Sequence, residues 1–409
     1  MLPEGWRRST LGEIARITSG GTPDRSKPEY WGGEIPWVTT GEIQFNTITG
    51  TAEKITAAGL QNSSAKRFPP GTLLMAMYGQ GKTRGQVAKL GIEATTNQNS
   101  AAILLNDGHD PDFYFHFLSS QYEDIRDFGH SGGISHLNAG LLKQIAVPVA
   151  PIHEQRRIAQ ILSTWDQAIA TAERLVANNQ RGTRDLMASL LSGRRRFPGI
   201  SAKWRYVNLD AMFERVARRN TTHNTNVLTI SAEHGLISQR EYFNKSVASA
   251  NLTGYTLLHR HDFAYNKSYS AGYPMGAIKP LMAYDAGVVS SLYLCFRLRD
   301  DVDADFDFFR HYFEAGLLNQ EIEGIAQEGA RNHGLLNVSV TDFFKLRLHI
   351  PGAPEQRRIA EVINVAKAEE GLLAAQLQAL QHEKAALMSQ LLTGKRRVKL
   401  PEAETEAQA

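Results

Sequence analysis

The chain has 409 residues, enough for two or three domains, and with 42% apolar and 21% charged residues its composition is that of a globular protein. A net charge of +3 neither requires nor excludes a polyanionic partner, and a single cysteine excludes a disulfide framework and a multi-cysteine zinc site. No apolar run reaches about eighteen residues and no signal peptide is recognisable, so we expect a cytoplasmic protein without a membrane partner.

Residues 1–150 predict a compact mixed domain composed mostly of strands. Runs of β-forming residues broken by glycine lie at 35–40, 71–79 and 96–105. A short segment with helical spacing is expected at 13–17 and a longer helix at 112–127.

The sequence AMYGQGKT, at residues 76–83, fits a relaxed phosphate-loop pattern with alanine in place of the first glycine. A phosphate loop needs a helix directly after it, so that backbone N–H groups and the helix dipole point at the phosphates. Here RGQVAKLG follows, which alternates like a strand. We interpret the segment as a basic glycine-rich loop and keep a nucleotide-binding enzyme as an alternative.

Two motifs occur twice. EQRRIA stands at Glu154–Ala159 and Glu355–Ala360, and LMASLLSGRRR at 186–196 returns as LMSQLLTGKRR at 387–397, both with an offset of 201 residues. An unchanged offset is what a continuous helix requires, because one inserted residue rotates everything beyond it by about 100°. The two long helices are expected within residues 151–198 and 351–398.

Apolar residues follow an alternating four-and-three spacing along both segments, which is typical of a coiled-coil seam. The expected seam residues are Ile158, Leu162, Trp165, Ile169, Ala172, Val176, Leu186 and Leu190, then Ile359, Ile363, Ala366, Leu373, Leu377, Leu380, Leu387 and Leu391. Polar interruptions are Asn179 and Thr183 in the first segment and Glu370 and Lys384 in the second.

Packing the helices antiparallel with level ends predicts partners for these interruptions. Asn179 falls opposite Glu370, so that its amide can donate to the carboxylate. Lys384 falls opposite Trp165, whose ring face can receive the ammonium group or the stem of the lysine.

A glycine followed by three basic residues ends each helix, at Gly193 and Gly394. This pattern predicts a left-handed cap with cations at the negative end of the helix dipole. Contacts with phosphates or with a partner protein remain alternatives for the basic residues 194–196 and 395–397.

Residues 199–350 repeat the organisation of residues 1–150. Trp204 and Leu209 match Trp6 and Leu11 at an offset of 198. DADF at 303–306 resembles DPDF at 110–113, and Leu336-Asn337 resembles Leu137-Asn138. Strands are expected at 226–232, 261–266 and 287–298, and helices at 211–216 and 305–322. The order of segments predicts a closed pseudo-twofold arrangement whose C-terminus ends near the N-terminus, followed by an acidic tail at 399–409.

A globular unit and an EQRRIA helix, repeated once, resemble the specificity (S) subunit of type I restriction-modification systems over the whole chain. Supporting stretches are SGGTP at 19–23, PPGTLL at 69–74, TTNQNSA at 95–101 and VVSSLY at 288–293. The resemblance implies an α+β fold with two similar mixed α/β target recognition domains separated by two long antiparallel helices.

It also implies a function. In that family each target recognition domain reads one half of a split sequence in double-stranded DNA, the helices set the gap, and two copies of an adenine methyltransferase subunit dock on the helices. Restriction (nuclease and translocase) subunits are further expected partners. No methyltransferase motif of the NPPY type and no metal-ligand set is recognisable, so we expect a noncatalytic chain without a cofactor, S-adenosylmethionine being bound by the methyltransferase. A helical scaffold that binds only proteins remains an alternative.

Candidate DNA contacts are polar or basic residues in loops. Amides can pair bidentately with adenine and arginine with guanine. The candidates are Lys82, Arg84, Asn97, Gln98 and Asn99 in the first unit and Lys267, Tyr269, Tyr273, Arg331 and Asn332 in the second. For Asn97–Asn99 the alternative is a strand with a turn, in which the backbone satisfies the amides.

The EQRRIA motif places Gln155, Arg156 and Arg157, and their copies Gln356, Arg357 and Arg358, at the start of a helix. The helix dipole disfavours cations there, so helix stability does not explain the arginines. We expect acidic partners, located either in the adjoining globular unit, where they would form a clasp, or on a docked methyltransferase.

Overall fold

The computed structural model describes residues 2–79, 81–127, 136–231, 234–243, 251–269, 272–328 and 336–399. The chain divides into two compact units, each of which contains one globular domain and part of both long helices. Unit 1 comprises Met1–Arg174 with Ala374–Ala409, and unit 2 comprises Leu175–Leu373. The acidic tail expected after Lys399 lies outside the described residues.

A five-stranded sheet with the order β2-β9-β6-β7-β4 forms the centre of unit 1. Its central strand β6 is buried at every position, which explains why the sequence there is a continuous apolar run. A three-stranded sheet, β5-β3-β8, and an antiparallel pair, β1-β10, complete the domain. The strands are β1 Arg7–Thr10, β2 Ala15–Ser19, β3 Trp31–Val38, β4 Thr47–Ile48, β5 Glu53–Ile55, β6 Leu73–Ala76, β7 Val87–Leu90, β8 Thr95–Thr96, β9 Ser100–Leu105 and β10 Ala146–Val149.

Unit 2 repeats this centre with a sheet in the order β12-β19-β16-β17, which corresponds to β2-β9-β6-β7. The pair β11-β22 corresponds to β1-β10, and three further antiparallel pairs lie around the sheet. The strands are β11 Arg205–Asn208, β12 Phe213–Arg215, β13 Leu228–Ser231, β14 Gly235–Ser238, β15 Thr256–His259, β16 Phe263–Asn266, β17 Ala277–Pro280, β18 Ala286–Val289, β19 Leu294–Leu298, β20 Gln327–Glu328, β21 Leu336–Asn337 and β22 Arg347–Ile350. The predicted strands of both units are confirmed.

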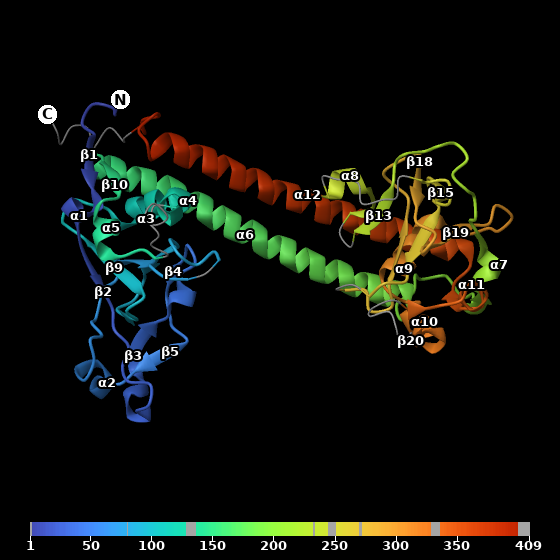
Figure 1. Cartoon of the computed structure of the whole chain (residues 1–409), viewed down its shortest axis with the longest axis horizontal. Coiled ribbons are helices and arrows are strands. Elements are labelled where there is room, and N and C mark those ends of the chain that lie inside the picture. The colour runs from blue at the N-terminus through green and yellow to red at the C-terminus, as the bar shows by residue number, and fades with distance from the viewer. Residues whose placement is uncertain are drawn as a thin grey trace. The chain divides into compact units, whose positions relative to one another are not determined.

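Short helices flank the two sheets (Figure 1). They are α1 Leu11–Ile14, α2 Ala57–Gln61, α3 Pro111–Ser120, α4 Tyr122–Asp127 and α5 Ala139–Lys143 in unit 1, and α7 Leu209–Met212, α8 Gln239–Phe243, α9 Phe306–Glu314, α10 Asn319–Ile325 and α11 Val340–Phe344 in unit 2, with 3-10 turns at Pro28–Tyr30 and Thr40–Glu42. The helical interpretation of residues 13–17 and 211–216 was wrong beyond the first turn. Those residues continue as β2 and β12, because Ala15 and Ile17 alternate inward against β9.

N-caps correct the alignment of the repeat. Asp110 accepts the N–H of Phe113 at 2.9 Å at the start of α3, and Asp305 accepts the N–H of Phe308 at 2.8 Å at the start of α9. The counterpart of Asp110 is therefore Asp305 and not Asp303, because the capping carboxylate has to stand directly before the helix.

The long helices are α6, Ile152–Leu191, and α12, Ala353–Leu391 (Figure 1). Every predicted seam residue, polar interruptions included, is buried or half-buried, whereas most neighbouring positions are exposed. Unit 1 packs the first half of α6 against the last turns of α12, and unit 2 packs the last turns of α6 against the first half of α12. The expected fold of two similar mixed domains and two antiparallel helices is confirmed.

Both helices end in the predicted cap. Gly193 and Gly394 have φ values of +74° and +72°, and each donates its N–H to the carbonyl three residues earlier at 3.2 Å. A Cβ at Gly394 would lie 2.6 Å from the Cδ of Pro3, so the end of α12 packs directly on the N-terminal segment within unit 1. The predicted proximity of the two ends of the chain is thereby confirmed for the described residues.

The predicted partners of the polar seam residues need correction. Lys384 pairs with Asp166, which is adjacent to the expected Trp165, because a carboxylate binds an ammonium group more strongly than a ring face does. Glu370 accepts from Lys367 of its own helix at 3.0 Å, and Oδ1 of Asn179 is buried without a hydrogen-bond partner in the described chain. The predicted hydrogen bond between Asn179 and Glu370 is therefore not formed.

A buried histidine lies where each globular domain packs on a long helix. In unit 1, Nε2 of His116 is 3.4 Å from Oγ of Ser163 on α6. In unit 2, Nε2 of His311 is 2.7 Å from Oδ1 of Asn364 on α12. Burial lowers the pKa of His116 to about 4, although the nearby Asp166 acts in the opposite direction, and burial likewise lowers the pKa of His311.

We expect His116 to make unit 1 less stable in mild acid. Between pH 6.5 and about 4 the unfolded chain binds a proton that the folded chain excludes, so stability falls as the pH falls. The contribution of this group at pH 5 should be about 2 kcal/mol lower than at pH 7. Urea unfolding of the His116→Gln variant should lack this part of the pH dependence. The matched control is His382→Gln on the exposed face of α12, and equal pH dependence in both variants would contradict the prediction.

Candidate functional site

The loop after β6 carries the GKT sequence of unit 1. Gly79, Gly81 and Gly85 have φ values of +138°, +77° and +86°, so the loop turns through conformations that favour glycine. It leads directly into β7, so no helix dipole faces the position where a phosphate would sit. Lys82 is exposed, and its carbonyl accepts the hydroxyl of Tyr122. The geometry agrees with a basic loop between strands.

Arg84 was expected to reach out of this loop, but its side chain is only 7% exposed. A side chain as buried as this is not presented at the surface. The loop turns this side chain inward, and its role as a DNA contact stays a prediction.

The TTNQN segment consists of β8 and the turn that leads from it into β9. Asn97 accepts the N–H of Asn99 at 3.0 Å and the hydroxyl of Ser100 at 3.1 Å, and its amide donates to Thr40 Oγ1 at 3.0 Å. This is the structural alternative for Asn97, whose side chain shapes the turn. Gln98 is exposed at its tip, and Asn99 is half-buried.

The corresponding loop of unit 2 follows β16. Tyr269 is 65% exposed and Lys267 is half-buried. Tyr273 donates its hydroxyl to Glu314 on α9 at 2.8 Å and accepts from Lys279 at 2.7 Å, so its phenol is held inside a polar cluster. Arg331 and Asn332 lie outside the described residues.

The first residue of the EQRRIA motif forms a buried clasp that sequence reasoning missed. In unit 1 the carboxylate of Glu154 is 1% exposed and receives Arg397 through two bonds at 2.5 and 2.9 Å. The indole N–H of Trp6 donates to the same carboxylate at 3.3 Å. Arg397 also donates to the carbonyl of Glu4 at 3.1 Å. The start of α6, the segment after α12 and the N-terminal segment therefore meet at one buried charge.

Unit 2 contains the same clasp. Glu355 is 3% exposed and receives Arg196 at 2.7 and 2.9 Å and the indole of Trp204 at 3.2 Å. Arg196 also donates to the carbonyl of Ala202 at 2.6 Å. The last arginine of each basic run therefore forms an ion pair with the other long helix. This ion pair decides between the roles considered for that arginine, namely a helix cap, a phosphate contact and a contact with a partner protein. The recurrence of glutamate and arginine at the offset of 201 was the signal that could have revealed this pair.

The glutamines of the motif form a second clasp. Gln155 is buried, accepts the N–H of Asp110 at 2.8 Å and donates to the carbonyl of Ala150 at 2.7 Å. Gln356 accepts the N–H of Asp305 at 3.0 Å and donates to Pro351 at 2.9 Å. Each glutamine thus fixes its long helix to the capped start of α3 or α9, as the clasp interpretation predicts.

The four arginines of the two motifs differ in their surroundings. Arg357 pairs with Asp303, and the guanidinium of Arg358 lies 4.6 Å from the ring centre of Phe197. Arg157 donates to Gln160 on its own helix at 2.8 Å. Arg156 is exposed and has no ion pair with any described residue. Of these arginines, only Arg357 therefore has, within the described chain, the acidic partner in its own globular unit that the clasp interpretation expects, and Arg156 is left available.

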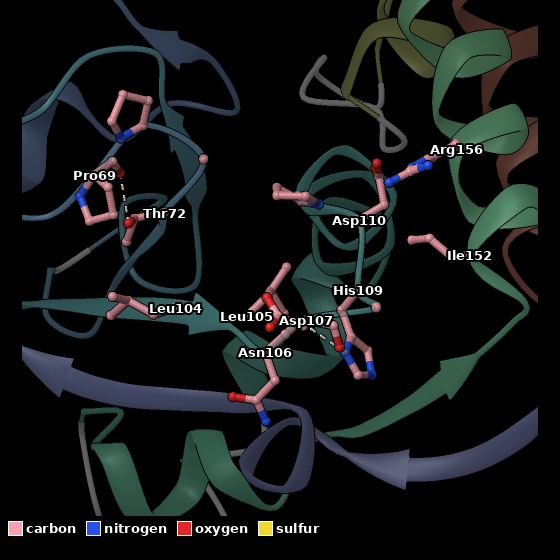
Figure 2. Close-up of a pocket in the computed structure, with 14 residues that line it drawn as sticks. Pro69, Thr72, Leu104, Leu105, Asn106, Asp107, His109, Asp110, Ile152 and Arg156 are labelled. Carbon is pink, nitrogen blue, oxygen red and sulfur yellow. Dashed lines mark hydrogen bonds between the residues drawn. The ribbon is translucent and has the colours of Figure 1, made fainter.

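A pocket of about 390 Å³ lies beside Arg156 in unit 1 (Figure 2). Arg156 and Ile152 of α6 form one wall, the turn at Pro69–Thr72 forms the opposite wall, and residues 104–111 lie between them. Nε2 of His109, which lines the pocket, is buried without a hydrogen-bond partner among the described residues. The pocket thus has a free guanidinium and an unsatisfied ring nitrogen at its edge.

The cysteine, the candidate metal ligands and the helices of the described residues are further features that bear on function. Burial raises the pKa of Cys295 to about 12, which makes it an inert thiol. Within the described ranges, His, Cys, Asp and Glu side chains form no group of three that could hold a metal ion. No helix in the same part of the chain is both long and apolar enough to cross a membrane.

Comparison with known proteins identifies the relatives of this fold. Residues 3–178 match the family model described as type I restriction modification DNA specificity domain. The MjaIX specificity subunit of Methanocaldococcus jannaschii is 28% identical over 173 residues, covering 41% of this chain and 39% of that protein. The EcoR124I/EcoR124II specificity subunit of Escherichia coli is 29% identical over 163 residues, covering 38% and 40%. The matched region spans about two fifths of each of these relatives.

A solved structure extends the likeness to the whole chain. The S subunit of a type I restriction-modification system from M. genitalium superposes with a TM-score of 0.55 at 14% identity, covering 97% of both chains. At this identity the likeness concerns the fold alone. Together with the matches in sequence, it confirms the resemblance to specificity subunits.

We expect the Glu154 clasp to stabilise unit 1. The Arg397→Ala variant leaves a buried carboxylate without its charged partner, which should cost about 1–3 kcal/mol after allowance for the half-exposed arginine. Urea unfolding measures the loss. The control is Arg396→Ala, an exposed neighbour in the same basic run, and equal stability of both variants would rule out the role of the clasp.

Proposed function

We propose, because residues 3–178 match the family model described as type I restriction modification DNA specificity domain, that this chain is the DNA-recognition subunit of a type I restriction-modification complex. Each globular domain reads one half of a bipartite, asymmetric target in double-stranded DNA. The long helices fix the spacing between the halves. The domains implied are residues 1–150 and 199–350, with the helices in 151–198 and 351–398.

A single observation supports this proposal most strongly, namely that one framework occurs twice with different loops. The sheet order, the N-cap aspartates and the buried glutamate clasps recur in both units. The loop after β6 reads YGQGKTRG, whereas the loop after β16 begins KSYSAGY. Two equal frameworks with unlike loops suit two readers of unlike base sequences.

Catalysis belongs to partner subunits in this proposal. Two copies of an adenine methyltransferase subunit, which binds S-adenosylmethionine, dock on the helices, and restriction subunits join them. Large apolar side chains that remain exposed on the helices support a docking role, since Leu175 is 52%, Val365 is 65% and Leu372 is 73% exposed. The chain itself acts as a noncatalytic reader and scaffold.

Base and phosphate contacts are proposed for exposed residues of the variable loops. In unit 1 these are Lys82 and Gln98, and in unit 2 Tyr269 with Lys267 beside it. Arg331 and Asn332 remain proposed readers because arginine and asparagine can pair bidentately with guanine and adenine. Asn97 and Tyr273 hold their loops through hydrogen bonds.

Exchange of one domain tests the proposal as a whole. Replacing residues 1–150 by the corresponding domain of another specificity subunit should change one half of the target and leave the other half and the spacer unchanged. Mapping methylated adenines in cells that express the complex measures this outcome. A single continuous palindrome, or a change in both halves, would contradict a bipartite reader.

Gln98 and Asn97 form a matched pair of residues for testing the proposed DNA contacts of unit 1. Gln98→Ala should relax specificity at one base position at a cost of about 1–3 kcal/mol, with folding unchanged because the side chain is exposed. Asn97→Ala should instead destabilise the turn, since it removes hydrogen bonds to Asn99, Ser100 and Thr40. Binding to targets varied at each position measures the first effect and urea unfolding the second. Unchanged specificity in Gln98→Ala would show that Gln98 does not contact a base.

The two alternatives make different predictions. A nucleotide-binding enzyme would bind ATP or GTP through the loop at residues 76–83 in the isolated chain. A scaffold that binds only proteins would give no sequence-selective protection of DNA in the assembled complex. Calorimetry with nucleotides and footprinting of the complex distinguish both from the proposed reader.

A further inference from the structure

We propose that the pocket beside Arg156 is a docking site for an acidic side chain of the methyltransferase subunit, and that unit 2 fills the matching position with its own aspartate. This inference rests on the function proposed above and concerns which residue holds the partner. It makes the two EQRRIA motifs, which are identical in sequence, unequal in binding.

Unit 2 shows which group binds the arginine at this position of the motif. Arg357, the copy of Arg156, pairs with the carboxylate of Asp303. Asp303 lies in the connection between β19 and α9, two residues before the N-cap Asp305. A carboxylate from a neighbouring loop is therefore the ligand of this position in the one unit where it is occupied.

Unit 1 lacks that carboxylate. Its connection from β9 to α3 comprises residues 106–110, five residues against the seven at 299–305 in unit 2. Two residues before the N-cap Asp110 stands Gly108, with φ of +84° and open space around the position of a Cβ. Arg156 is left exposed beside the pocket, so a carboxylate can reach it from outside.

The remaining lining residues suit a protein side chain. Ile152 and the prolines at 69 and 70 give apolar walls for the methylene groups of a glutamate or for the backbone around it. Of the two carboxylates in the lining, Asp110 is held by its cap bond to Phe113, and Asp107 is exposed to solvent. A phosphate of DNA would also satisfy the guanidinium, but the occupant in unit 2 is a protein carboxylate, and we choose the protein partner on that ground.

Two independent variants should block the site. Arg156→Gln removes the charge, and Gly108→Asp supplies an internal carboxylate as unit 2 does. Each should weaken binding of the purified methyltransferase subunit to the full chain by roughly five- to tenfold. Gly108→Asn is the control, because it imposes the same backbone strain without the charge and should bind like the unchanged chain. Arg357→Gln should also leave methyltransferase binding unchanged.

Calorimetric titration with the methyltransferase subunit, together with DNA binding at several salt concentrations, decides between outcomes. Equal affinity of the unchanged chain and Arg156→Gln would overturn the inference while leaving the proposed function intact. Unchanged methyltransferase binding with a salt dependence of DNA affinity reduced by about one charge would assign Arg156 to a phosphate, and would also overturn it. If the unchanged chain binds no methyltransferase subunit, the proposed function fails first.

Discussion

One buried carboxylate in each unit holds together the start of one long helix, the segment after the other long helix and a tryptophan. Glu154 and Glu355 are almost completely shielded from water, so each requires a cation and further donors to remain charged. Arg397 lies 243 residues beyond Glu154 and Arg196 lies 159 residues before Glu355, yet both make two bonds to their carboxylate. An unpaired charge at this depth is costly. The folded structure therefore needs the glutamate, the arginine after the other helix and the adjacent tryptophan together, and we call these three residues the clasp set. From this set the chain runs through β1 and α1 into β2 in unit 1, and through β11 and α7 into β12 in unit 2, and so reaches the sheet that carries the variable loops.

The two clasps also explain how the chain closes on itself. In unit 2 the arginine that follows α6 donates to the carbonyl of Ala202, a few residues along the same continuous chain. In unit 1 the arginine that follows α12 donates to the carbonyl of Glu4, at the other end of the chain. The same hydrogen bond thus joins two residues of one continuous stretch in unit 2, and joins the C-terminal segment to the N-terminal segment in unit 1. The hydrogen bond at the end of each long helix therefore depends on where the two segments lie in space, and not on whether they are continuous in the chain.

Sequence predicted the elements that depend on local pattern and missed the contacts that depend on three-dimensional neighbours. A constant offset of 201 predicted two uninterrupted helices. The glycine caps predicted at Gly193 and Gly394 have the expected left-handed φ values. The seam stripe was predictable because its period is a property of the helix alone. The partner of Lys384 was displaced by one residue, since a stripe defines a face but not which neighbouring side chain carries the charge. The direction of Arg84 was unpredictable for the same reason, because a glycine-rich loop can turn a side chain inward or outward.

Duplication explains why the candidate site could be predicted only in part. The repeated framework conserves whatever the clasps and caps require, so comparison of the two copies isolates residues with a structural role, such as Gln155 and Gln356. Residues that differ between the copies are free of that requirement and can diverge in function. The connection before α3 is two residues shorter than the one before α9, and it carries Gly108 where unit 2 has Asp303, the carboxylate that pairs with Arg357. A difference in this connection therefore leaves Arg156 without the surface ion pair that Arg357 forms, although the motif that carries the two arginines is the same.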